Sequence, residues 1–296
     1  DKSRSRGLGD VYKRQAERYG ATVHPIEVEW GQIIDPEQVA VALTEHPKVK
    51  MVGVVHAETS TGAHQPIEEI AKLVHDAGAL LVVDCVTSLG GLPVPVDDWE
   101  ADAVYSGTQK CLSCPPGLAP VTFSERAMEK LEARSTKVGS WYLDLTMLRN
   151  YWGSDRVYHH TAPINMTYAL REALLMIVEE GLEPRFARHE KNHRALRAGL
   201  EAMGLEYIPS HSLTTLNAVR VPDGADDGAV RSRLLNEYGI EIGAGLGPFK
   251  GQAWRIGLMG HSSTQQNVML VLTALESILC DQGLSLPKGE AIAAAA

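Results

Sequence analysis

The sequence predicts an α/β protein: a large first domain with a mostly parallel sheet, followed by a smaller α+β domain. Two observations support this prediction. Apolar segments of strand length recur along the first half of the chain, and amphipathic helical segments separate them. Continuous apolar strands are typical of a parallel sheet that helices cover on both faces. In such sheets, ligands bind where the carboxyl ends of strands meet loops and helix starts.

The elements of the first half alternate along the chain. Strands are expected at 21–28, 49–55, 79–83, 103–106 and 120–124, and helices at 36–45 and 66–77. The first of these helices places Val39, Ala42 and Leu43 on one side. The second begins with proline, whose missing N–H costs nothing at a helix start, and Gly78 ends it.

The second half has a different texture. An irregular aromatic segment is expected at 141–160, helices at 169–180, 183–204, 228–238 and 265–279, and strands at 216–221 and 252–257. We therefore place a domain boundary near Gly181. The expected division is a foreign or disordered leader (1–15), a large domain that is incomplete at its N-terminus (16–180), a small domain (181–288) and a frayed tail (289–296).

The composition excludes several classes of protein. Apolar residues make up 44% of the chain and charged residues 22%, which argues against intrinsic disorder. The net charge of −9 argues against nucleic acid or an anionic membrane surface as the main partner. No apolar run approaches the ~20 residues of a membrane span. Four cysteines do not make a disulfide scaffold in a chain of this length, so a reducing compartment, the cytoplasm, is expected.

An aspartate and a lysine follow two of the predicted strands. Asp84 comes directly after segment 79–83, and Lys110 lies among small and apolar residues beyond strand 103–106. Burial lowers the pKa of a lysine and frees its amine to attack a carbonyl carbon. This arrangement fits pyridoxal 5′-phosphate (PLP), with the lysine as Schiff base and the aspartate keeping the pyridine nitrogen protonated. From the residues alone, a solvated lysine and a helix-capping aspartate are the alternatives.

Two other motifs are interpreted as structural. Cys111 and Cys114 form a CxxC motif, but no second CxxC or histidine pair with ligand spacing follows, and a zinc site needs four ligands or three and a water. His159 and His160 are adjacent, so they cannot bind one metal ion from one helix face. We therefore expect no metal site.

Five motifs, in order and spacing, resemble the class V PLP-dependent aminotransferases. They are HAETSTG (56–62), VDCVTSLGG (83–91), YSGTQK (105–110), YHHTAP (158–163) and WRIGLMG (254–260). The sequence is most similar to the alanine–glyoxylate / serine–glyoxylate (serine–pyruvate) group, over nearly all of 16–282. The resemblance implies the type I fold of PLP-dependent transferases.

The resemblance also implies roles for individual residues. Lys110 would form the Schiff base and then move a proton between the substrate Cα and the cofactor C4′, and Asp84 would pair with the pyridine nitrogen. Arg255 would hold the substrate α-carboxylate, because a guanidinium matches a carboxylate in a bidentate fork. The remaining contacts to the cofactor would be Val86 at the ring face, Thr59 near the phenolic oxygen, Gln109 at the phosphate, and Tyr158 and Thr161 at the phosphate of the neighbouring subunit of a homodimer.

The function implied is ping-pong transfer of an amino group from alanine or serine to glyoxylate, so the partners are small amino and 2-oxo acids. The donor stays open, and aminoethylphosphonate or ureidoglycine transaminases are close alternatives. A cysteine desulfurase would need a cysteine on a mobile loop and usually a histidine stacked over the ring, whereas Cys280 is expected in a C-terminal helix. Members of the family normally begin well upstream of Ala16, with a glycine-rich turn and helix N-terminus that hold the PLP phosphate. A non-catalytic truncated remnant, with impaired or no activity, is therefore the last alternative.

Overall fold

The computed structural model describes the backbone of residues 8–296 and the side chains from Lys13 onward. Residues 1–7 of the expected leader lie outside the described residues. Helix α1 (Leu8–Arg18) begins inside the rest of that leader. The boundary expected near Gly181 falls between helices α6 (Ile164–Glu180) and α7 (Leu182–Ala202), and the division into domains stays a prediction.

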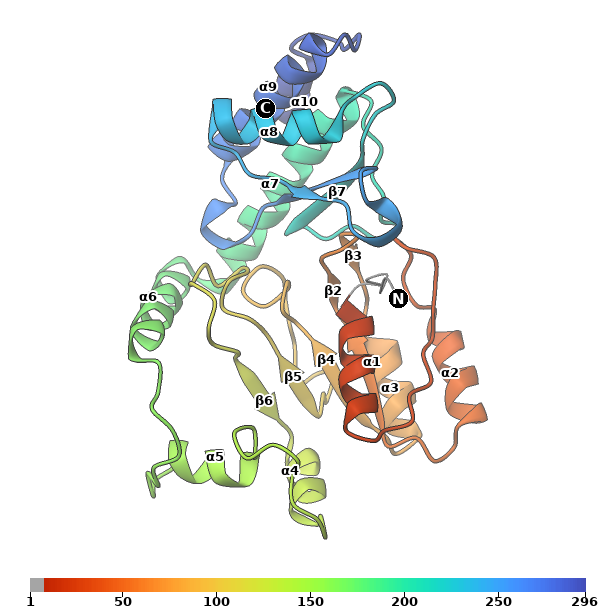
Figure 1. Cartoon of the computed structure of the whole chain (residues 1–296), viewed down its shortest axis with the longest axis vertical. Helices are drawn as coiled ribbons and strands as arrows, with labels where there is room; N and C mark the ends of the chain where they lie inside the picture. Colours follow the sequence, from red (N-terminus) through yellow and green to blue (C-terminus); the bar gives the residue numbers. More distant parts are fainter. Residues whose placement is uncertain (1–7) are drawn as a thin grey trace.

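A four-stranded sheet forms the centre of the first half (Figure 1). Its order is β1 (Met51–Val55), β4 (Leu80–Asp84), β5 (Ala103–Tyr105) and β6 (Val121–Phe123). The first three strands are parallel, and β6 is antiparallel to β5. Each strand lies inside, or within one residue of, its predicted segment. The mostly parallel sheet is therefore as the apolar segments predict.

The helices beside this sheet begin and end where local chemistry places them. The Asp35 carboxylate caps α2 (Pro36–Glu45) by accepting a hydrogen bond from the N–H of Glu37 at 2.9 Å, and Pro36 stands where no N–H is needed. Helix α3 (Glu68–Asp76) ends before Gly78, whose φ of +70° favours glycine. Their apolar sides pack on the sheet in one core. Its most buried members are Ile67, Ile70, Val74, Ala79, Leu81, Val83 and Cys85.

Two predictions of local structure are wrong. The segment 21–28 is not a strand, because in the part of the chain that the structure describes no strand pairs with it and β1 lies at the sheet edge. A strand needs a ladder partner for its backbone groups. The segment 141–160 is not wholly irregular, since it contains α5 (Leu145–Trp152). The Asp144 carboxylate caps this helix by accepting from the N–H of Thr146 at 3.0 Å. Helix α4 (Glu125–Glu132) precedes it.

The second half builds a separate antiparallel sheet and core. Strand β9 (Ala253–Gly257) lies between β7 (Leu216–Arg220) and β8 (Gly243–Ala244). Helices α7, α8 (Asp227–Tyr238) and α9 (Gln265–Asp281) pack with this sheet, above the first sheet in Figure 1. Trp254, Leu234, Leu272 and Ile278 are among its fully buried side chains. These helices and the two longer strands confirm the predicted elements.

The C-terminal segment is ordered rather than frayed. Residues Glu290–Ala295 form helix α10, and Ala291 and Ala295 are buried in the second core. The close approach depends on small residues. A side chain at Gly199 of α7 would place its Cβ only 2.9 Å from the carbonyl oxygen of Ala291. The alanine-rich sequence therefore docks because α7 offers a glycine at the contact.

The two sheets meet at the carboxyl ends of the first. The short hairpin of β2 (Ala57–Glu58) and β3 (Ala63–His64) follows β1. A small apolar cluster joins this region to the second sheet, and its members are Ala57, Leu92, Leu213 and Leu216, with Met259 packed against them. The loops after β1, β4 and β5 therefore lie near β9, and side chains from both sheets can converge there.

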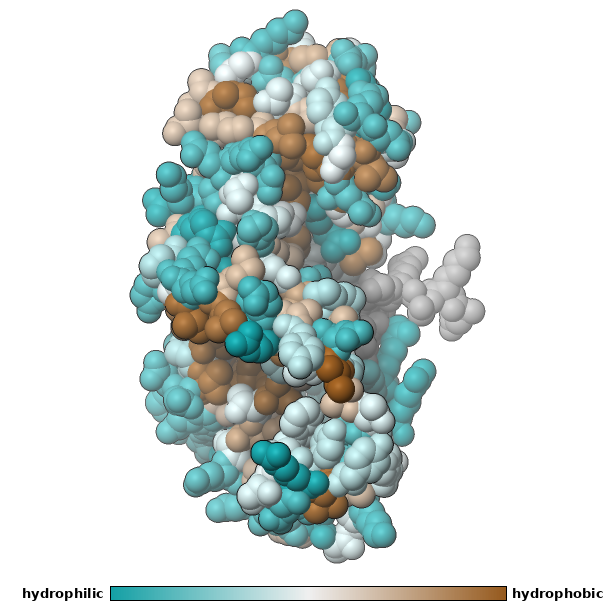
Figure 2. Space-filling model, turned by 90° about the vertical axis from the view of Figure 1, so that its left-hand side faces the viewer, coloured by the Kyte–Doolittle hydropathy of each residue, from teal (hydrophilic) through white to brown (hydrophobic). Residues whose placement is uncertain are grey.

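One face of the molecule exposes many large apolar side chains. They come mostly from α5, α6 and the segments beside α5: Trp141, Tyr142, Leu143, Trp152, Val157, Tyr158, Ile164, Tyr168 and Val178. Figure 2 views the molecule from the side on which α6 lies and shows brown patches between the hydrophilic areas. Among the described residues, no helix is long and apolar enough to cross a bilayer.

The buried histidines predict that acid weakens the fold. Burial lowers the pKa of His56 to about 3 and that of His189 to about 4, and it also lowers the pKa values of His64 and His193. Unfolded histidines take up protons near pH 6.5, so stability falls as the pH drops from 6.5 toward 4. We expect a loss of roughly 2 kcal/mol between pH 7 and 5 for His56 and again for His189.

Urea unfolding at pH 7 and at pH 5 measures this loss. The variant His189→Gln should show a smaller loss than the wild type, whereas the exposed His261→Gln should keep all of it. Equal stability of the wild type at the two pH values would contradict the prediction.

Candidate active site

Asp84 is a buried carboxylate at the carboxyl end of β4, with 3% of its surface exposed. Its Oδ1 accepts a hydrogen bond from the N–H of Val86 at 2.9 Å, and its Oδ2 accepts one from the Tyr105 hydroxyl at 2.7 Å. Burial raises the pKa of Asp84, and these two hydrogen bonds oppose the rise. In the part of the chain that the structure describes, no lysine or arginine forms an ion pair with it. The site therefore has a buried anion that would gain from a cationic N–H.

Tyr105 is a site residue that the sequence analysis did not select. It is the last residue of β5 and lies opposite Asp84 in the parallel pairing of β4 with β5. This register brings the phenol to the carboxylate. Both strands can be predicted from the sequence. The contact between the two side chains is indicated there only by the position of each residue at the end of its strand.

Lys110 lies in the loop after β5 and is half-buried. Burial lowers the pKa of its amine, and the positive charge of Arg255 lowers it further. Both effects increase the fraction of neutral amine, which is the nucleophilic form. Lys110 is thus partly removed from solvent, and within the described part of the chain no carboxylate forms an ion pair with it, so its surroundings favour chemistry at the amine.

Arg255 is at the centre of β9 and faces the loop after β1. Its Nη1 donates to the carbonyl oxygen of Thr59 at 3.0 Å, and its Nε donates to that of Ala244 at 2.8 Å. These bonds use two of the five N–H groups of the guanidinium. Burial lowers the pKa of Arg255, and the charge of Glu58 opposes this. The arginine is thus a partly desolvated cation held by backbone carbonyls, which suits a carboxylate ligand.

The other predicted residues fall into two groups. Val86 follows Asp84 by two residues and Gln109 precedes Lys110, whereas Thr59 reaches Arg255 through its carbonyl oxygen. Gln109 is exposed, and its Oε1 lies 2.7 Å from where a Cβ on Gly107 would stand, so the glycine lets this side chain fold back over the loop.

Tyr158 and Thr161 lie apart from this group within the chain. They are exposed, in the loop between α5 and α6 at the left edge of Figure 1, and their hydroxyl oxygens are 3.1 Å apart. Among the described residues, no hydrogen bond or ring contact joins either of them to Lys110. The adjacent His159 is buried and stacks on Trp141, with ring centroids 4.1 Å apart.

Next to Asp84 lies a pair of histidines, of which His56 is buried and His64 half-buried. Nε2 of His56 lies 2.9 Å from Nε2 of His64, and Nδ1 of His56 lies 2.9 Å from the Ser88 hydroxyl. The N–H of His56 donates to the carbonyl oxygen of Asp84. The pair therefore connects the end of β1 with the turn that follows Asp84.

The cysteines of the CxxC motif are buried and free. The Cys111 thiol donates to the carbonyl oxygen of Thr87 at 3.3 Å, and burial raises its pKa to about 12. Such a thiol packs as a core residue. Among the described residues, no group of three or more histidine, cysteine or acidic side chains is placed to hold one metal ion.

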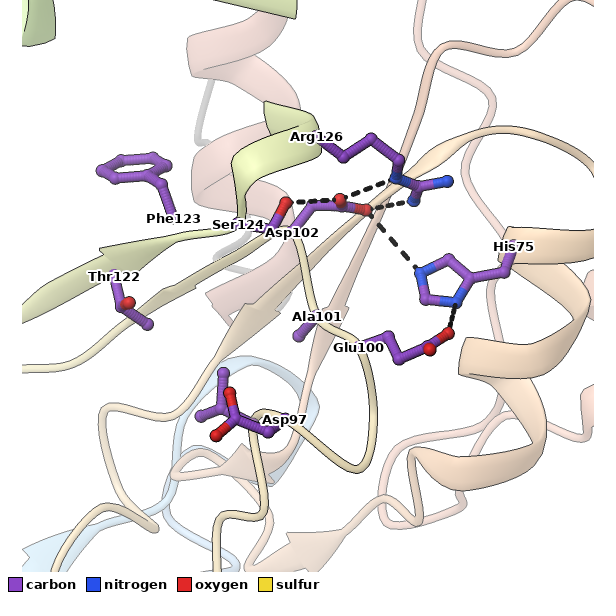
Figure 3. Close-up of a pocket in the computed structure, with 10 residues that line it drawn as sticks. His75, Asp97, Glu100, Ala101, Asp102, Thr122, Phe123, Ser124 and Arg126 are labelled. Atoms are coloured by element: carbon purple, nitrogen blue, oxygen red, sulfur yellow. Dashed lines mark hydrogen bonds and ion pairs between the residues drawn. The ribbon is translucent and has the colours of Figure 1, made fainter. Parts of the chain in front are cut away.

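A pocket of about 430 Å³ lies at the opposite end of β5, before the strand begins (Figure 3). The Asp102 carboxylate there accepts hydrogen bonds from Ser124 Oγ at 2.8 Å, Arg126 Nε at 2.9 Å and the N–H of Leu81 at 2.7 Å. Although burial opposes ionisation, these bonds keep the pKa of Asp102 below its usual range. The Asp102 carboxylate therefore links β4, β5 and α4. Its partners are groups of the protein itself, so we interpret this pocket as structural and keep the residues around Lys110 as the candidate active site.

The residues at the carboxyl end of the sheet fit PLP. The pyridine nitrogen, when protonated, supplies the cationic N–H that the buried Asp84 carboxylate lacks among its described partners. The half-buried Lys110 offers an amine of lowered pKa for the aldehyde carbon, and Arg255 would supply a cation for a substrate carboxylate. The three groups come from loops and a strand that the packing of the two sheets brings together.

Known proteins share this sequence and fold. A sequence profile described as aminotransferase class-V matches residues 11–268. The chain is 41% identical over 308 residues to (S)-ureidoglycine–glyoxylate transaminase of Bacillus subtilis (strain 168), covering 97% of this chain and 74% of the relative. It is 41% identical over 283 residues to alanine–glyoxylate aminotransferase of Callithrix jacchus, covering 92% and 68%. The crystal structure of alanine–glyoxylate aminotransferase from Nostoc sp. has a TM-score of 0.89 at 49% identity, over 92% of this chain and 72% of that one.

The buried carboxylate predicts that Asp84→Asn stabilises the chain without added cofactor. The raised pKa means that ionised Asp84 weakens the fold above pH 4, whereas the amide keeps an acceptor oxygen and carries no charge. We expect a gain of about 1 kcal/mol at pH 7.5, comparable with other single stabilising changes. The gain should vanish below about pH 4, where the carboxyl group is neutral in both states. Urea unfolding measures it, with the exposed Asp97→Asn as control; a less stable Asp84→Asn variant at pH 7.5 would refute it.

Proposed function

Because the chain belongs to the class-V aminotransferase family, whose members use PLP, we propose that it transfers the amino group of alanine or serine to glyoxylate. The predicted type I fold is confirmed by the family and by the solved relative. One observation supports the proposal most: a buried anion, a half-buried lysine and a partly desolvated arginine meet at the carboxyl edge of the sheet. PLP, when bound, withdraws electrons from the substrate Cα and so makes loss of its proton feasible.

Asp84 sets the protonation of the cofactor ring in this proposal. A carboxylate in a buried site pairs strongly with a cation, so it favours the protonated pyridine nitrogen. The Tyr105 hydroxyl and the N–H of Val86 hold the two oxygens in place. Val86 follows the carboxylate by two residues and would lie against the ring.

Lys110 would attach the cofactor and later move the proton at the substrate Cα. The charge of Arg255 lowers the pKa of the Lys110 amine before substrate arrives. A substrate carboxylate on Arg255 neutralises that charge, so the amine becomes a stronger base when the substrate is in place. The two residues are thus coupled electrostatically through the substrate.

The homodimer remains part of the proposal. Tyr158 and Thr161 are exposed in the loop between α5 and α6, the two helices that contribute many of the exposed apolar side chains of one face. A second copy packed on that face would bury these side chains and place the two hydroxyl groups at the partner's cofactor phosphate. Gln109 would contact the phosphate from its own chain, and Thr59 the phenolic oxygen. The four free cysteines fit a reducing compartment, and we propose the cytoplasm.

The names of the relatives support (S)-ureidoglycine as a second candidate for the amino donor. The Bacillus relative is named for (S)-ureidoglycine and glyoxylate, and the Callithrix relative for alanine and glyoxylate. Glyoxylate is common to both names, so we propose it as the acceptor. The amino donor is then the property to test. A cysteine desulfurase is disfavoured, because Cys280 lies within helix α9 rather than on a loop.

A donor panel tests the proposal. The full chain is incubated with PLP, glyoxylate and one of alanine, serine, (S)-ureidoglycine, 2-aminoethylphosphonate or cysteine, and glycine formation is followed by mass spectrometry. We expect alanine or serine to give glycine at least about tenfold faster than the other donors, a difference of ~1.4 kcal/mol in the barrier. Lys110→Ala should abolish the reaction. Faster glycine formation from (S)-ureidoglycine would transfer the assignment to that donor, and no glycine from any donor would overturn the proposal.

Arg255→Lys should weaken binding of both substrates. A lysine keeps the charge but loses the bidentate fork, which we expect to raise KM for donor and for glyoxylate by about 10- to 100-fold, or roughly 1.5–3 kcal/mol. Steady-state kinetics measure the change. Arg220→Lys, at an exposed position on the neighbouring strand β7, is the matched control and should leave KM unchanged. An unchanged KM in Arg255→Lys would exclude the carboxylate role.

A further inference from the structure

Arg185, near the start of α7, is a buried arginine with 4% of its surface exposed. Its Nε donates to the carbonyl oxygen of Gly90 at 2.7 Å, and its Nη2 donates to that of Cys111 at 2.6 Å. Its Nη1 pairs with the Glu180 carboxylate at 2.7 Å. A buried guanidinium is stable only when its charge is balanced and its N–H groups are hydrogen-bonded. Here each of the three nitrogens of Arg185 donates to an acceptor, and the Glu180 carboxylate balances the charge.

The two carbonyl groups belong to the loops that carry the reacting residues. Gly90 ends the turn that begins at Asp84, and Cys111 is the neighbour of Lys110. The loops also touch directly, because a Cβ on Gly91 would lie 2.6 Å from the Cys111 sulfur. One guanidinium therefore joins the backbone of the two loops at their contact.

The same helix also contacts the loop that follows β9, the strand that contains Arg255. Nη1 of Arg188 donates to the carbonyl oxygens of Gly260 and Ser263, at 3.0 and 2.6 Å. Nε2 of His189 accepts from the N–H of Gly260 at 2.9 Å. Arg188 shares the Glu180 carboxylate with Arg185, and Arg188 is the main cause that lowers the pKa of Glu180 to about 2. The first turns of α7 thus contact the loops after β4, β5 and β9.

We propose that Arg185 is a positioning residue, which fixes the backbone of Cys111 against Gly90 and thereby the placement of the Lys110 amine relative to Asp84. This inference rests on the proposed function, in which those two groups act on the cofactor. The planar fork of arginine reaches two carbonyl oxygens and a carboxylate at once. A lysine ammonium is a point charge on a flexible stem and does not hold the same three groups in a fixed geometry.

The first test measures Lys110 in the full chain without cofactor. Acetic anhydride acetylates neutral amines, and mass spectrometry of the Lys110 peptide across pH gives the midpoint of its reactivity. In Arg185→Lys the loop gains freedom and water reaches the amine, so the midpoint should rise by at least about half a pH unit. The matched control is Arg194→Lys, on the exposed side of the same helix, which should give the wild-type midpoint.

Other variants separate positioning from stability. Arg185→Gln is a second variant in case the lysine variant does not fold, and it should show the same rise. Glu180→Gln keeps Arg185 and its two carbonyl partners, so it should lower the melting temperature with the Lys110 midpoint unchanged. A wild-type midpoint in folded Arg185→Lys and Arg185→Gln would overturn the proposal, whether or not these variants melt earlier.

The second test uses the PLP-loaded chain. A misplacement of about 1 Å costs on the order of 100-fold in rate, so kcat in Arg185→Lys should fall about 10- to 100-fold, with KM within about threefold. A rise in KM with unchanged kcat would contradict a role at Lys110. Absence of glycine formation by the wild type would be a failure of the proposed function alone, because the acetylation test needs neither cofactor nor turnover.

Discussion

The buried carboxylate of Asp84 is the constraint on which the rest of the site depends. It is held by a backbone N–H and a phenol, and burial raises its pKa. A charge in this position weakens the fold unless a cation joins it, so the chain is less stable at the place where we propose that the cofactor ring binds. The parallel strands make this possible, because β4 and β5 end side by side and present Asp84 and Tyr105 to one another.

Two cationic side chains approach this edge of the sheet. Lys110 comes from the first sheet and Arg255 from the second. Burial lowers the pKa of both, and the charge of Arg255 lowers the pKa of Lys110 further. In the proposed reaction, a substrate carboxylate on Arg255 would relieve this repulsion. Helix α7 holds the loops through Arg185 and Arg188, and continues into the second core through Leu196 and Leu200. The packing of the second half therefore helps to determine the geometry of the first.

Much of this architecture could be predicted from the sequence, and the exceptions have physical reasons. The strands β1, β4 and β5 follow from continuous apolar segments, and Asp84 and Lys110 from their places after them. Segment 21–28 has strand composition, but no strand of the described residues pairs with it. The alanine-rich end of the chain suggests fraying, but α10 packs on α7 because Gly199 leaves room for it. The contact of Tyr105 with Asp84 depends on strand register. The contacts of Arg185 are with residues 74 and 95 positions away along the chain, and no local sequence pattern predicts such contacts.

The most direct test of this account is to locate the cofactor on the chain. The full chain is mixed with a small excess of PLP, reduced with borohydride and digested, and the pyridoxyl group is mapped by mass spectrometry. The account predicts one modified residue, Lys110, with exposed lysines such as Lys137 and Lys191 unmodified. Modification spread over exposed lysines, or none at Lys110 in a folded chain, would contradict the claim that Asp84, Lys110 and Arg255 form a PLP site.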